Sequence, residues 1–188
     1  MVKRGSYLDR GWQSLISRRE ELALAAGVRI VSNRAVASVI RDPKVCGVVL
    51  ENGEIARSSA VLVAASPRTT AELIAADPRT HIMAWARNAT PIVASCLDVA
   101  LTSLPRPKVV AAFGIDRPLY ASVQSATAQL TPDGGALIHL MRYGGLRGSD
   151  AHTVEAELAR ILDLLQPGWR ELLLKKRFLP NLTSLTHW

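Results

Sequence analysis

Apolar residues recur at helical spacing near both ends of this chain. Near the start, Trp12, Ile16 and Leu22 fall close to one face, and Gly27 stands where a helix C-cap favours positive φ. Near the end, Asp150 is placed to cap a helix whose apolar positions are Val154, Leu158, Ile161, Leu162 and Leu165. These patterns predict a helix over residues 11–26 and a more amphipathic helix from Asp150 to Pro167.

A different periodicity follows the first helix. Short strands are predicted over residues 28–32 (VRIVS) and 35–41. Asn52-Gly53 predicts a tight two-residue hairpin turn between strands at 45–50 and 55–57, because such a turn needs positive φ at both positions. Residues 60–65 (AVLVAA) have almost no polar alternation, which is typical of a strand covered on both faces. Ser66 and Pro67 then predict an N-cap and the first position of a helix reaching about Ala76.

The pattern changes again in the second half of the chain. After a short helix at 81–87, four apolar segments, 92–101, 109–115, 119–125 and 136–143, are separated by turns rich in proline or glycine. This spacing predicts an antiparallel meander. The helix beginning after Asp150 is expected to lie across one face of that sheet, and residues 171–178 to return as a strand. A domain boundary is therefore expected between residues 80 and 91.

Composition narrows the possible functions. The net charge is +7, but the basic residues are scattered and aromatic residues make up only 5% of the 188 residues, so nucleic-acid binding is not expected. No apolar run approaches the ~20 residues needed to cross a bilayer, and the basic N-terminus lacks the apolar part of a signal peptide. A cytoplasmic location is therefore expected.

The two cysteines and four histidines show no metal-ligand spacing, so no metal site is expected.

No sequence motif in the chain identifies a catalytic residue. GxGxxG, GxxxxGK[ST], GxSxG and HExxH are all absent from the sequence. The helix at Ser66 could present free N–H groups to an anion, or Ser66 could act only as a cap. Tyr120, Ser122 and Gln124 alternate along a predicted strand, where they could line a pocket or simply mark a half-exposed strand.

The order of the segments resembles that of a known family. The glycine-led helix GWQSLISRREELALAA, the strand GVRIVS, the hairpin GVVLENGEI and the segment AVLVAASP follow one another as in FAD-dependent oxidoreductases of the phytoene desaturase and amine oxidase type. PIVASCLDVALTSLPRP, FGIDRPLYASVQSA, LTPDGGALIHLMRY, LDLLQPGW and KRFLPNLT continue with segments that resemble the substrate domain of a bacterial branch of that family.

The resemblance implies a mixed fold of α/β plus α+β character. Residues 1–85 would form part of a Rossmann-like FAD-binding domain with a β-hairpin excursion, and residues 86–188 part of a substrate-binding domain, an antiparallel sheet covered by a helix. By position in the family, the backbone of Val36 would meet the adenine of FAD, and Ala64, Ala65 and Ser66 would border the AMP half. Tyr120 and Ser122 would face the substrate.

The same resemblance implies that two family segments lie outside this sequence. One is the N-terminal GxGxxG loop that holds the pyrophosphate, and the other is a C-terminal flavin-binding segment. The chain is then an internal portion of an FAD-dependent oxidoreductase that transfers hydride from an apolar, carotenoid-like or amine-like substrate. It is expected to be inactive alone and to need a complementing chain. The alternative is a non-catalytic module that acts by self-association or partner binding, for instance as a homo-oligomer.

Overall fold

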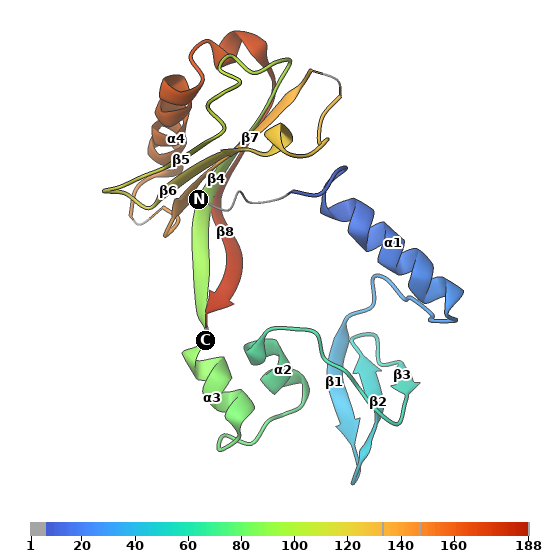
Figure 1. Ribbon diagram of the computed structural model, residues 1–188. Helices are drawn as coiled ribbons and strands as arrows, with labels where there is room; N and C mark the ends of the chain where they lie inside the picture. The colour runs from blue at the N-terminus through green and yellow to red at the C-terminus, as the bar shows by residue number, and fades with distance from the viewer. Residues whose placement is uncertain (1–6, 133, 147, 188) are drawn as a thin grey trace, which may run out of the picture. The chain divides into compact units, whose positions relative to one another are not determined.

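The computed structural model describes residues 7–132, 134–146 and 148–187, and these residues divide into two compact units (Figure 1). One, called the sheet unit here, comprises the described residues up to Gly27 together with Ile92–Leu185. The other, called the hairpin unit, comprises Val28–Pro91 with Thr186 and His187. Each unit is described by itself.

The hairpin unit is built on a three-stranded antiparallel sheet. Its strands are β1 (Val36–Arg41), β2 (Val45–Leu50) and β3 (Ile55–Arg57), in that order across the sheet. The predicted hairpin is confirmed, but the two-residue turn is wrong. Leu50 and Glu54 close a three-residue loop in which Gly53 has φ +84° and Asn52 has no positive φ. The Asn52 side chain instead accepts a hydrogen bond from the Glu54 backbone N–H at 3.1 Å.

Two short helices complete the hairpin unit. They are α2 (Pro67–Leu73) and α3 (His81–Asn88), and they pack against each other. The N-cap expected at Ser66 is confirmed: its side-chain oxygen accepts from the Thr69 N–H at 3.1 Å, and Pro67 occupies the first helical position. The helix ends earlier than the predicted Ala76: Ile74 is its C-cap, and Ala75 has a φ of +46°, which a helix cannot contain.

Two predicted strands of this unit are wrong. Residues 28–32 and 60–65 have no strand structure, and the side chains of Val31 and Leu62 are 54% and 96% exposed. An isolated extended segment has no ladder hydrogen bonds and no covering layer, so apolar content alone cannot make it a strand. Among the described residues, the three strands of this unit form a separate sheet in which neither segment takes part.

The sheet unit contains five strands in the order β5-β6-β7-β4-β8. Their bounds are β4 (Thr90–Leu101), β5 (Ala111–Phe113), β6 (Leu119–Val123), β7 (Ala136–Tyr143) and β8 (Leu173–His187), and the 3-10 turns η1 (Gln124–Ala126) and η2 (Trp169–Leu172) precede β7 and β8. The predicted four-strand meander holds only for β5, β6 and β7. Strand β4 skips its sequence neighbour and pairs antiparallel with β7, Asp98 opposite His139.

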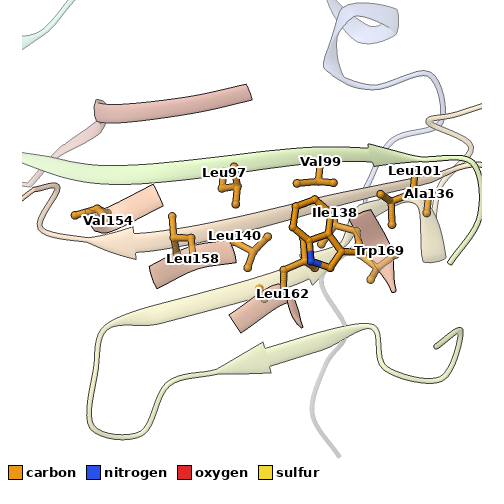
Figure 2. Close-up of a cluster of buried hydrophobic side chains, with 12 residues drawn as sticks. Leu97, Val99, Leu101, Ala136, Ile138, Leu140, Val154, Leu158, Leu162 and Trp169 are labelled. Atoms are coloured by element: carbon orange, nitrogen blue, oxygen red, sulfur yellow. The ribbon is translucent and has the colours of Figure 1, made fainter. Parts of the chain in front are cut away.

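A single helix covers one face of this sheet. Helix α4 (Ala151–Leu165) begins at the predicted cap, where Asp150 accepts from the Thr153 N–H at 2.9 Å. Its residues Val154, Leu158 and Leu162 are fully buried, and Figure 2 shows them against strand side chains that include Leu97, Leu140 and Ile138. The other members of this core are Val99, Leu101, Ala121, Val123, Ala136 and Trp169.

Helix α1 (Trp12–Ala25) belongs to the sheet unit but buries no residue. The chain just before it is attached to the loop after β6: the Arg10 N–H donates to the Gln129 carbonyl at 2.9 Å, and the Asp9 carboxylate accepts from the Gln129 N–H at 2.7 Å. The predicted apolar stripe is present in sequence, yet Trp12 and Ile16 are 72% and 53% exposed. Within the described part of the chain, no helix combines the length and apolarity that a membrane span requires.

Candidate functional site

The face of the five-stranded sheet opposite α4 carries polar side chains in register. Strand residues alternate between faces, so the neighbours of Leu97, Val99 and Ile138 point away from the core. In one row across this open face lie Ser122 of β6, His139 of β7 and Asp98 of β4. The adjacent row holds Phe113, Tyr120, Met141 and Cys96. The fold thus brings the side chains of these two rows together on a single face.

Tyr120 and Ser122, expected to face the substrate, lie together on this open face. Both are hydrogen-bonded to the hydroxyl of Tyr7, Tyr120 at 3.1 Å and Ser122 at 2.9 Å between oxygens. The Phe113 ring also packs on Tyr120, with 5.3 Å between ring centroids. Burial of the ring, with the neighbouring Tyr7 hydroxyl, raises the pKa of Tyr120 against the opposing effect of Ser122, so the phenol stays neutral.

A chain of paired charges crosses β7, β4 and β8. His139 Nδ1 lies 2.6 Å from one oxygen of Asp98, and the guanidinium of Arg177 donates to the other oxygen at 2.7 and 3.2 Å. The side chains of His139 and Asp98 are only 17% and 22% exposed. Asp98 therefore stands between two cationic partners.

These contacts shift both ionisation equilibria. The hydrogen bond from His139 holds the pKa of Asp98 below its ordinary value, against the effect of burial and with help from Arg177. Burial alone would lower the pKa of His139, but the hydrogen bond to Asp98 and contributions from Cys96 outweigh it and raise the pKa to about 9. His139 is therefore an imidazolium at neutral pH and donates its Nδ1–H to Asp98.

A cavity of about 470 Å³ opens beside this chain of charges. Charged or polar side chains line part of it, namely Asp98, Gln124, His139, Lys175 and Arg177. Ala100 and Leu137, which are cross-strand partners, supply apolar wall. This volume lies in the range of pockets that hold small organic ligands.

The residues expected to border a dinucleotide lie in the hairpin unit. Val36 begins β1 opposite Leu50 and is 37% exposed, and Ala64 and Ala65 lie in an exposed segment. Ser66 follows them at the start of α2, which packs against β1. The structure therefore brings Val36 and 64–66 into one unit and Tyr120 and Ser122 into the other.

Sequence reasoning missed His139, Asp98 and Arg177. One signal was available: Asp98 interrupts the apolar segment IVASCLDVAL, and an acidic residue inside a buried strand normally needs a partner. The partner could not be read from the sequence, because His139 and Arg177 are 41 and 79 residues away. Among the described residues, no group of three or more His, Cys, Asp or Glu side chains could hold a metal ion.

Comparison with known proteins supports a fold relationship. No family model matches the chain, and no curated protein sequence matches it. An oxidoreductase from Methanosarcina mazei is similar in structure over 90% of the chain, with a TM-score of 0.68 and 16% identity. A proposed protoporphyrinogen oxidase from Exiguobacterium sp. 255-15 is similar over 95% (TM-score 0.65, 12% identity), and a reduced UDP-galactopyranose mutase over 85% (TM-score 0.61, 14% identity).

The chain covers 42%, 40% and 36% of these three structures, respectively. At such identities the likeness concerns the fold alone. The chain has a mixed α/β architecture with antiparallel sheets that matches part of the fold of these three proteins.

Proposed function

We propose that this chain is a portion of an FAD-dependent oxidoreductase, with residues 1–85 contributing to the FAD-binding domain and 86–188 to the substrate-binding domain. The observation that carries the proposal is the structural similarity to an oxidoreductase and to a proposed protoporphyrinogen oxidase, over 90% and 95% of the chain. The order of sequence segments that resembles the phytoene desaturase and amine oxidase type supports it independently. A Rossmann-like FAD-binding domain belongs to this proposal.

The residues present fit part of the FAD molecule. Ala64 and Ala65 are exposed, and their side chains are only methyl groups. A planar ligand can therefore approach the main chain closely at these two residues. Ser66 already accepts from Thr69, so its part is to fix the start of α2 rather than to hold a phosphate. A glycine-rich loop for the pyrophosphate is absent from the sequence, so this chain alone fits the adenosine end only.

In the proposed enzyme, FAD accepts hydride from a C–H or N–H bond of the substrate. The open sheet face would orient that substrate. Tyr120, Ser122 and Tyr7 offer hydroxyl groups that are already hydrogen-bonded to one another, so they are held in place before a ligand arrives. His139 adds a fixed positive charge below a pH of about 9, its Nδ1–H held by Asp98.

A complementing chain is part of the proposal. The segments 28–32 and 60–65 have strand-like sequences, yet Val28, Val31 and Leu62 are more than half exposed. Extended apolar segments with unpaired backbone gain most from a partner sheet. We propose that a dinucleotide-binding part supplied by such a chain packs against these segments.

The test is co-purification of the tagged chain from cells that produce it, followed by a flavin absorbance spectrum. The proposal expects a second chain and a flavin band in the same fraction, with added FAD taken up weakly by the chain alone. Ala64→Glu should abolish flavin retention, since the added carboxylate would meet the cofactor. Ala151→Glu, at an exposed position of α4, is the matched control and should retain it.

A colourless chain that ignores FAD with or without co-purified protein would contradict the proposal. A defined oligomer of this chain under those conditions would favour the second candidate, a non-catalytic module. The exposed apolar side chains Val28, Val31 and Leu62 favour that candidate too, because they can be covered by another copy.

A further inference from the structure

The open face of the sheet unit contains a pocket with an excess of positive charge. It lies over β7, β4 and β8, and its ionisable lining groups are Asp98, His139, Lys175 and Arg177. Lys175 and Arg177 outnumber the one carboxylate, so the pocket is net positive even with His139 neutral. Because Asp98 is already paired with both His139 and Arg177, its charge is largely neutralised within the protein.

Two of these cations keep hydrogen-bonding capacity for a ligand. A guanidinium has five N–H donors, and Arg177 directs its Nε and one terminal nitrogen to a single oxygen of Asp98. Lys175 is exposed, and within the described residues it makes no salt bridge. Together they can donate charge-assisted hydrogen bonds to the carboxylate of a ligand. Such hydrogen bonds are stronger than those between neutral groups.

Side chains alternate between the two faces of the sheet along β8, so only some of its basic residues face the pocket. Lys176, the next residue, extends to the opposite side of the sheet, where it pairs with Glu155 of α4 at 2.6 Å. Lys175 and Arg177 are two positions apart and share the open face. Lys176 is thus paired with a carboxylate of α4, whereas Lys175 faces the pocket.

Apart from Gln124, the rest of the pocket wall is apolar. Ala100 and Leu137 are opposite each other across β4 and β7, next to the Asp98–His139 pair. A ligand whose charge meets Lys175 can therefore lay a hydrocarbon part on these side chains. Inorganic phosphate would use the cations but not this wall, and a cation would meet net repulsion.

We propose that this pocket binds a carboxylate with an apolar body, with Lys175 and Arg177 holding the carboxylate and Ala100 and Leu137 contacting the body. Such a molecule would be the substrate class of the proposed oxidoreductase, in place of the carotenoid-like or amine-like class that the sequence resemblance implies, and that last step rests on the proposed function. The binding itself needs no flavin, because every lining residue belongs to the sheet unit.

The test is an NMR titration of the full chain with octanoate, followed by octanol, octylammonium and inorganic phosphate. Octanoate should shift the signals of residues 98, 100, 137 and 175, and should bind at least about ten-fold more tightly than any of the other three probes. Lys175→Ala should weaken octanoate binding at least about five-fold, and Lys175→Glu more. The matched control Lys176→Ala should leave it unchanged within about two-fold.

Four outcomes of these titrations would overturn the inference. Octanol binding as tightly as octanoate would mean a purely apolar site, and phosphate binding as tightly would mean a general anion site. Equal losses in the Lys175 and Lys176 variants would mean that only overall charge matters, and no octanoate shift would mean no site. Flavin uptake separates the two proposals. If the chain binds octanoate but retains no flavin, only the proposed function is rejected. If it retains flavin but does not bind octanoate, only the inference about the pocket is rejected.

Discussion

The two units differ in the size of the side chains they bury. In the sheet unit, Leu97, Ile138, Leu140, Leu158 and Leu162 are at most 2% exposed. In the hairpin unit, the buried residues among those described are Gly47, Pro67, Ala71 and Ala86. A layer of helix packed on a layer of sheet makes a core, whereas a small sheet with two short helices leaves the large apolar residues of the hairpin unit half-buried or exposed. The sheet unit is therefore expected to be the more stable of the two.

The largest expected effect on the free energy of unfolding comes from shortening a buried side chain in the core of the sheet unit. Leu158→Ala should lower the free energy of unfolding by about 2–5 kcal/mol, because it removes buried contacts and leaves a cavity. Leu164→Ala on the same helix, at a position 75% exposed, is the matched control. Leu62→Ala in the hairpin unit, at a position 96% exposed, should have no measurable effect. Urea denaturation followed by circular dichroism gives all three values; a large loss in the Leu62 variant would refute the contrast between the units.

The next effect is a loss of stability at alkaline pH. The pKa of His139 is raised to about 9 in the folded chain from 6.5, so its contribution is fully present below pH 6.5 and disappears as the pH rises through 9. One pKa unit is worth about 1.4 kcal/mol, so the change in the free energy of unfolding is at most about 3.5 kcal/mol. Urea midpoints measured from pH 6 to pH 10 should fall across this window.

Two variants isolate the source of that pH dependence. Asp98→Asn removes the charged partner of His139, so the profile between pH 6.5 and 9 should flatten. His152→Gln changes an exposed histidine of α4 and should leave the profile as it is. An unchanged slope in Asp98→Asn would show that another group titrates there.

A third effect comes from a buried polar residue that anchors the loop before β5. Gln166 is 1% exposed; it accepts from the Arg106 N–H at 2.7 Å and donates to the carbonyls of Arg106 and Val109 at 3.2 and 2.8 Å. Gln166→Leu should cost about 1–3 kcal/mol, because it leaves these backbone groups unpaired. Gln13→Leu, in exposed helix α1, is the control. If the two variants unfolded at the same urea concentration, the loop would not depend on Gln166.

Local features of this fold could be predicted where neighbouring residues determine them. Asp150 with Val154 and Leu158 defined α4, and Ser66-Pro67 defined the start of α2, because a cap and an apolar stripe act within a few residues. Residues 60–65 show the limit. Their composition is that of a buried strand, but burial needs a neighbouring layer, and a local sequence cannot supply one.

The site shows the same limit at longer range. Tyr120 and Ser122 could be singled out because alternation along one strand is a local property. The Asp98–His139–Arg177 chain could not, because it depends on β4 lying between β7 and β8 rather than beside β5. That strand order pairs segments far apart in the chain, which no local pattern of residues specifies.

The smallest expected effects come from the two helix caps, which occur one in each unit. Asp150→Ala removes the acceptor for the Thr153 N–H on a helix that forms the core, so it should lower the urea midpoint of global unfolding, by less than Gln166→Leu does. Ser66→Ala removes the corresponding acceptor for Thr69 and should cost helix α2 about 1 kcal/mol. Because α2 buries only Pro67 and Ala71, we expect this loss as faster amide exchange at Thr69 and Thr70 with no change in the global midpoint. A shift of the global midpoint in Ser66→Ala equal to that in Asp150→Ala would mean that both units unfold together.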